Sequence, residues 1–85
     1  MDPQQQLNEL ERLAESLDVK VSYEPISGLV HSAGGLCRVR AEYRIIVDRK
    51  LKPRERVQVL VQALRTFDTE AHFLSPGVRE LFDTA

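Results

Sequence analysis

The sequence contains no tryptophan, and its 85 residues include only two tyrosines and three phenylalanines. So few aromatic side chains argue against a surface that binds nucleic-acid bases by stacking. No apolar run approaches the roughly 18–20 residues that are needed to cross a bilayer. Residues 1–6 lack both the basic and the apolar part of a secretory signal, so we expect a soluble, cytoplasmic protein.

Cysteine is equally scarce, since Cys37 is the only one and an internal disulfide is therefore impossible. This usage suits a reducing compartment. A metal site needs at least three convergent ligands, whereas the soft ligands here, His31, Cys37 and His72, lie far apart in the sequence. Glu70 next to Ala71 and His72 offers only one carboxylate–imidazole pair. We therefore expect no metal, no cofactor and no catalytic residue, and we interpret Cys37 as a small buried residue.

Three of the four glycines lie within residues 26–35, which suggests a phosphate-binding loop. Such a loop leads from its glycines into a helix N-terminus, often with a lysine. This segment leads into a strand pattern instead, so we interpret it as a flexible connection.

The N-terminal part of the chain shows two successive periodicities. Asp2 and Pro3 are typical of a helix N-cap and first position, with Gln5 placed for a capping box. A helical apolar spacing follows at Leu7, Leu10, Ala14 and Leu17. Together these features predict a helix over residues 3–17. The alternation of Val19, Val21 and Tyr23 with polar residues then predicts a half-buried strand that Pro25 ends.

Two further strands are predicted at residues 36–40 and 43–47, with Arg40 paired with Tyr43 across a tight turn at Ala41-Glu42. Neither turn residue favours a positive φ, so a longer hairpin loop is an alternative. Alternation divides the side chains between two faces of the hairpin. One face carries Leu36, Arg38, Arg40, Tyr43, Ile45 and Val47, and the other carries Cys37, Val39, Arg44 and Ile46. Because neither face is purely polar, either both are covered or one contacts a partner.

Two helices are predicted in the C-terminal half. Pro53 begins the first, whose apolar stripe comprises Val57, Leu60, Val61, Leu64 and Phe67. Its three valines leave a strand at residues 57–61 as an alternative. Ser75-Pro76 begins a short helix with Val78, Leu81 and Phe82 on its apolar side. We thus predict one small α+β domain over residues 1–85, in the order α-β-β-β-α-α, with a three-stranded, mostly antiparallel sheet.

Charge is the most uneven property of the chain, whose overall net charge is −1. Residues 1–24 carry six acids and two bases, whereas residues 38–56 carry eight bases and three acids. The bases of the second segment are Arg38, Arg40, Arg44, Arg49, Lys50, Lys52, Arg54 and Arg56. Several of them surround a predicted helix start, where cations oppose the helix dipole. This placement favours an acidic partner, either elsewhere in the fold or on another molecule.

The order of the predicted elements resembles the beginning of the ImmA/IrrE type of zincin-like domain. There, an apolar strand comparable to Tyr43-Arg44-Ile45-Ile46-Val47-Asp48 precedes a helix with an H-E-x-x-H motif, which would fall on Val61-Gln62-Ala63-Leu64-Arg65. Val61 and Arg65 replace the two histidines, and Gln62 replaces the glutamate. Valine cannot ligate zinc and glutamine cannot act as a general base. The resemblance covers roughly residues 4–68 and implies a non-catalytic relative, with no functional residue carried over.

Three functions are compatible with these observations. The first is a non-enzymatic protein-interaction or adaptor module that could also self-associate, for example as a homodimer. Its contact residues would be Arg38, Arg40, Tyr43 and Arg44 on the hairpin and Lys50, Lys52 and Arg54 beyond it. The second is a nucleic-acid-binding protein that uses basic residues 38–56. The third is an enzyme whose site would need His31, Cys37 and His72 to converge.

Overall fold

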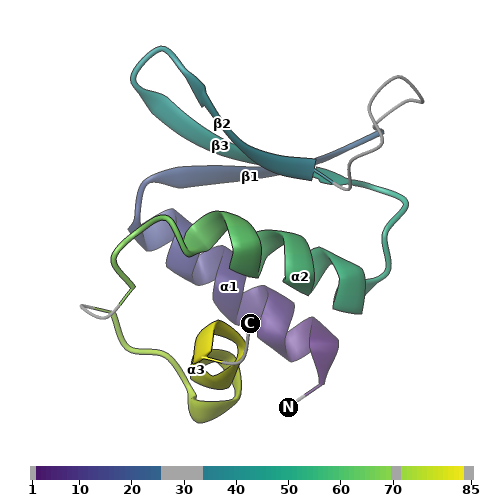
Figure 1. Ribbon diagram of the computed structural model, residues 1–85. Helices are drawn as coiled ribbons and strands as arrows, with labels where there is room; N and C mark the ends of the chain where they lie inside the picture. The colour runs from purple at the N-terminus through teal and green to yellow at the C-terminus, as the bar shows by residue number, and fades with distance from the viewer. Residues whose placement is uncertain (1, 26–33, 70–71, 84–85) are drawn as a thin grey trace.

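The computed structural model describes residues 2–25, 34–69 and 72–83 (Figure 1). It confirms the predicted order of elements: α1 (Pro3–Ser16), β1 (Val19–Glu24), β2 (Gly34–Val39), β3 (Glu42–Asp48), α2 (Pro53–Leu64) and α3 (Pro76–Asp83). The alternative strand at residues 57–61 is wrong, because that segment lies within α2. Of the predicted flexible connection, residues 34–35 belong to β2 and residues 26–33 lie outside the described residues, as do His31 and Glu70.

The start of α1 has the predicted capping box. The Asp2 carboxylate accepts a hydrogen bond from the Gln5 backbone N–H at 2.9 Å, and the Gln5 side chain accepts one from the Asp2 N–H at 3.3 Å. The helix ends at Ser16, and Asp18 adopts a φ of 60° that turns the chain into β1. Aspartate tolerates this left-handed conformation better than most residues do.

The sheet has the strand order β1-β3-β2, with β1 parallel to β3 and β2 antiparallel to it. The sheet is therefore mixed, and the predicted mostly antiparallel arrangement is wrong for one of its two pairings. Because β3 carries buried Ile45 and Val47, it takes the central position and β1 pairs with it rather than with β2. Residues 25–33 connect the two edge strands.

The hairpin register also differs from the prediction. Tyr43 pairs with Arg38 rather than with Arg40, and the last pair is Val39 with Glu42. The turn therefore consists of Arg40 and Ala41, and the predicted turn at Ala41-Glu42 is wrong. Because this shift is two residues, each strand side chain stays on the face predicted for it, and only Arg40 leaves the strand.

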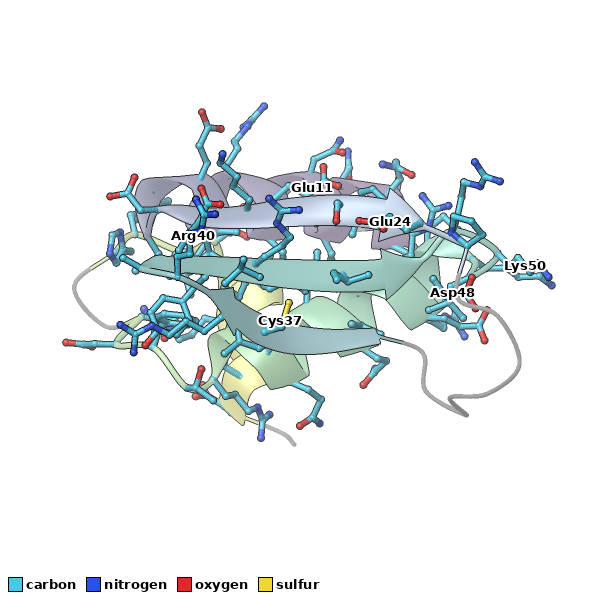
Figure 2. All side chains as sticks on the ribbon, turned by 90° about the horizontal axis from the view of Figure 1, so that it is seen from above. Glu11, Glu24, Cys37, Arg40, Asp48 and Lys50 are labelled. Carbon is cyan, nitrogen blue, oxygen red and sulfur yellow. The ribbon has the colours of Figure 1, made fainter. Side chains whose placement is uncertain are left out.

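The helices cover one face of the sheet only (Figure 1). α1 and α2 lie side by side beneath it, α1 under the β1 edge and α2 under the β2 side, and α3 packs beyond them. The shared core comprises Leu7, Leu10, Leu13, Ala14, Val19, Ile45, Val47, Val57, Leu60, Val61, Ala63, Leu64, Leu74 and Val78. No described helix covers the face that carries Cys37, Arg44 and Ile46, which we call the open face (Figure 2). In the described part of the chain, no helix combines the length and apolar character that a membrane span requires.

Candidate protein-interaction site

The β2–β3 hairpin ends in a segment, residues 38–44, that we call the hairpin tip. Of the large hydrophobic side chains exposed in the described residues, two lie here, Val39 at 52% and Tyr43 at 37%, while the third, Phe73, precedes α3. The tip also contains three arginines, Arg38, Arg40 and Arg44, against a single acid, Glu42. The structure thus gathers four of the seven predicted contact residues at one end of the sheet. Exposed apolar and cationic groups on a rigid hairpin are suited to contacting another protein.

On the helix-facing side of the tip, aromatic contacts hold Arg38 in place. Its guanidinium lies 5.5 Å from the centre of the Tyr43 ring, which is its cross-strand partner. The Tyr43 ring in turn meets Phe67 edge-on, with centroids 5.3 Å apart and an interplanar angle of 87°. These contacts restrict the Arg38 and Tyr43 rotamers before any partner arrives. Sequence reasoning assigned Phe67 to the α2 stripe and missed this role, because α2 ends at Leu64 and the turn that follows brings Phe67 to the hairpin.

Arg40 occupies the turn with a φ of 59°. For a residue with a Cβ this left-handed conformation costs roughly 1–2 kcal/mol, so glycine or asparagine would be favoured there. The Arg40 side chain is exposed. An arginine held at an unfavourable backbone position is one of the features that mark functional sites.

On the open face, Glu42 joins two cations. Its carboxylate lies 2.9 Å from the Lys20 ammonium and 3.5 Å from the Arg44 guanidinium. The hydrogen bond and the charge of Lys20 lower the pKa of Glu42, with a smaller contribution from Arg44. The Nε of Arg44 is buried and finds no acceptor within the described ranges, so it is a polar group that these parts of the fold leave unsatisfied.

The three remaining predicted contact residues do not join the tip. Lys50, Lys52 and Arg54 are exposed at the opposite end of β3, where the chain enters α2 (Figure 2). There the Glu55 carboxylate accepts a hydrogen bond from the Lys52 N–H at 3.0 Å and places negative charge in the first turn of α2. The basic segment 38–56 is therefore two separate clusters rather than one continuous stripe.

Arg56 belongs to neither cluster because it is used within the fold. Its guanidinium donates to the carbonyls of Leu51 and Arg49 at 3.0 and 2.9 Å, and it stacks 4.7 Å from the centre of the Tyr23 ring. Through these contacts Arg56 holds the connection between β3 and α2 against Tyr23 of β1. The sequence predicts an acidic partner for the bases around this helix start, whereas Arg56 binds backbone carbonyls that nothing local in the sequence reveals.

A groove of about 810 Å³ runs along the β1 edge beside α1. In it the Tyr23 hydroxyl donates a hydrogen bond to the Glu11 carboxylate. Burial raises the pKa of Tyr23, and the hydrogen bond and negative charge of Glu11 raise it further, while Arg56 acts in the opposite direction. The folded state therefore favours the neutral phenol.

This pairing predicts a loss of stability at alkaline pH. Because the pKa of Tyr23 is raised above its ordinary value of 10.0, its contribution is complete below pH 10 and is lost as the pH rises toward the folded-state pKa. Above pH 10, the free energy of unfolding of Tyr23→Phe should fall less steeply with pH than that of the wild type. Denaturation at a series of pH values would measure it. Tyr43→Phe leaves Tyr23 as the only tyrosine, so the tyrosinate absorbance of this variant reports Tyr23 alone. We expect that absorbance to appear only above pH 10, and an ordinary titration near pH 10 would contradict the pairing.

The residues of the enzyme hypothesis are not brought together where the structure describes them. Cys37 lies on the open face and is partly exposed rather than buried as predicted, because its face of the sheet carries no helix. The His72 ring lies 3.4 Å from the Ser16 hydroxyl at the end of α1, in the helical layer. Within residues 2–25, 34–69 and 72–83, no group of three or more histidine, cysteine, aspartate or glutamate side chains could hold a metal ion.

Two of the three positions that the zincin-like resemblance aligned with the histidines and glutamate of H-E-x-x-H take part in packing, namely Val61 within α2 and Arg65 directly after it. Val61 is buried in the core, whereas Gln62 is exposed. The Arg65 guanidinium donates to the carbonyls of Leu81 and Phe82 at 3.3 and 3.2 Å, which joins the end of α2 to α3.

Searches of protein-family models, curated proteins and solved structures each found nothing that matches this chain.

Proposed function

We propose that this chain is a non-enzymatic protein-interaction domain whose hairpin tip binds an acidic surface of a partner protein. One observation carries the proposal: the tip presents exposed Arg38 and Tyr43 on its helix-facing side, exposed Val39 on the open face and exposed Arg40 at the turn between them, on a hairpin fixed by the sheet. Tyrosine and arginine, together with tryptophan, are enriched at the energetically important centres of interfaces.

A protein partner suits this arrangement better than a nucleic acid does. Binding along a phosphate backbone uses many cations spread over a continuous surface. Here Lys50, Lys52 and Arg54 are separated from the tip by the length of β3, and Arg56 is engaged in the fold. The tip instead combines a few charges with exposed apolar area, as protein–protein contacts do.

The test compares two variants that carry the same change of charge. Arg38→Glu/Arg40→Glu reverses the tip, and Lys50→Glu/Arg54→Glu reverses the cluster at the start of α2. We expect the tip variant to bind its partner at least about a hundredfold more weakly, because like charges would face each other across the contact. The control variant should bind as wild type does, and its new acids near the α2 N-terminus should not destabilise the fold.

Partners would be captured quantitatively with all three proteins, identified by mass spectrometry, and their affinities measured with purified components. Equal binding by wild type and the tip variant would refute the proposal. If both variants lost binding equally and nuclease released the captured material, the result would indicate nucleic-acid binding instead.

Arg40→Asn separates binding from folding. Asparagine accepts the left-handed backbone, so the free energy of unfolding should stay unchanged or rise by up to about 1 kcal/mol. Partner affinity should nevertheless fall, because the cation is lost. If Arg40 served only the turn, the variant would bind its partner with undiminished affinity.

A further inference from the structure

The open face carries charges of like sign in two rows that run across the strands. In the basic row, Lys20 of β1 lies directly beside Arg44 of β3. In the acidic row, four residues further along both strands, Glu24 lies directly beside Asp48. Like charges at directly opposite positions of neighbouring strands are unfavourable. Each row therefore costs the isolated sheet some stability that charges of opposite sign would not cost.

Within the described residues, only the basic row has an ionic partner. Glu42 contacts both cations of that row, so one carboxylate serves two positive charges. The carboxylates of the acidic row accept hydrogen bonds from the Lys50 backbone N–H and the Ser22 hydroxyl, but neither forms an ion pair with a described residue. The acidic row is therefore left without a countercharge in these parts of the chain.

An uncharged centre separates the two rows. Ile46 stands on β3 midway between them, with Ser22 of β1 and Gly35 of β2 as its cross-strand neighbours. A Cβ added to Gly35 would meet no atom of the described structure within 4 Å, so there is open space beside the partly exposed Ile46 side chain. Glycine inside a strand often lies where another backbone or a ligand approaches closely. The face is thus basic, neutral and acidic in equal steps of about 6.6 Å along the strands.

We infer that two copies of this chain stack through their open faces, with Ile46 of one copy against Ile46 of the other. A two-fold axis that lies in the interface and crosses the strands at Ile46 reverses the strand direction of the second copy. The basic row of each copy then faces the acidic row of its mate, so that both cations of each copy meet a carboxylate. Stacked sheets lie about 10 Å apart, a separation that an arginine and an aspartate side chain can span together.

A second copy is the occupant that this charge pattern favours. A partner of one sign would match one row and be repelled by the other, whereas a copy turned by the two-fold axis matches both. The turn residues Arg40 and Lys50 lie beyond opposite ends of β3, outside the matched rows (Figure 2). The two hairpin turns then extend from opposite ends of the dimer and stay accessible. The inference therefore goes beyond the proposed partner binding and does not depend on it.

The dimer should be weak, because each copy contributes only three short strands and the contact falls at the small end of specific interfaces. We expect it to form at about 0.1–1 mM chain and to dissociate on dilution. Sedimentation equilibrium over this range should show the average mass rising from the chain mass of 9.7 kDa toward twice that value.

Charge-swapped variants test the matched rows. Lys20→Glu/Arg44→Glu makes both rows acidic, and Glu24→Lys/Asp48→Lys makes both rows basic. Each double variant alone should dimerise at least about tenfold more weakly than the wild type, because like charges would meet across the interface. An equimolar mixture of the two should form a heterodimer, since every acid of one row then faces a base of the other copy.

Lys52→Glu/Arg54→Glu provides a matched control. It makes the same change of charge as the acidic variant but at the start of α2, in the helical layer, and should dimerise as the wild type does. Circular dichroism would establish that each variant is folded. If a double variant fails to fold, the exposed residues of β1 repeat the test with Lys20→Glu, Glu24→Lys and the mixture of the two.

A wild type that stays monomeric up to about 1 mM would overturn the inference. So would row variants that dimerise as the wild type does, a mixture of folded variants that stays monomeric, or a control that weakens the dimer equally. Arg38→Glu/Arg40→Glu leaves both rows unchanged, so it should keep the dimer while it weakens partner binding. A monomeric wild type that still binds its partner through the tip would refute the dimer and leave the proposed function standing.

Discussion

Gly34→Ala is expected to lower the free energy of unfolding by at least about 2 kcal/mol. Gly34 begins β2 with a φ of 133°, a backbone conformation that residues with a Cβ rarely adopt. An added Cβ would lie 2.0 Å from the carbonyl oxygen of Ile46 and 3.0 Å from the Val47 Cα. These atoms belong to the backbone of the central strand, which cannot move aside without breaking its pairing with β1. For a domain of this size, the change corresponds to a fall in Tm of roughly 10 °C or more.

The neighbouring glycine provides a matched control. A Cβ added to Gly35 would meet nothing within 4 Å, and the residue has no positive φ. Gly35→Ala should therefore change the free energy of unfolding by no more than about 0.5 kcal/mol. Thermal and urea denaturation followed by circular dichroism would measure both variants. Similar midpoints for the two would contradict the close approach of Gly34 to β3.

Local patterns determined most of the elements but not how the strands combine. The capping residues Asp2 and Pro3 and the apolar spacing of α1 depend on nearest neighbours in the chain, so the helix could be predicted to within one residue. Strand order depends on which strands meet in space, and alternation in β1 is the same whether β1 pairs with β2 or β3. The parallel β1–β3 pairing was therefore beyond the sequence pattern.

The hairpin turn was misplaced for a related reason. The prediction placed the turn at Ala41-Glu42, although neither residue favours a positive φ, and the structure contains that conformation one residue earlier, at Arg40. Because the correction is two residues, the assignment of side chains to faces survived, and with it the prediction that Arg38 and Tyr43 share a face.

The candidate site was predictable only in part. The sequence suggested one basic segment at residues 38–56. In the structure β3 separates Arg40 from Lys50, and Arg56 donates hydrogen bonds to backbone carbonyls within the fold. The role of Phe67 gave no local signal, because its contact with Tyr43 depends on how the turn after α2 lies against the hairpin. Long-range packing therefore decided which predicted contact residues act together.

Ile45→Ala is expected to lower the free energy of unfolding by about 2–5 kcal/mol, the range for replacing a core isoleucine by alanine. Ile45 is fully buried on the central strand, where it pairs with Val21 on one side and Leu36 on the other. Ile46→Ala removes the same atoms one residue later, from the partly exposed open face. It should cost only about 1 kcal/mol, since little more than strand preference is lost. Urea denaturation at concentrations too low for self-association would measure the difference.

The comparison of these two isoleucines tests the feature on which the proposals depend, namely that the helices cover one face of the sheet. If both substitutions cost the same, the open face would have to be covered within a single chain, and a partner could not reach Arg44 there. If Ile46→Ala is mild in the isolated chain but becomes costlier when the partner is bound, the contact extends from the hairpin tip across the open face. In that case binding removes from water the open-face side of β3, which is partly exposed in the free protein.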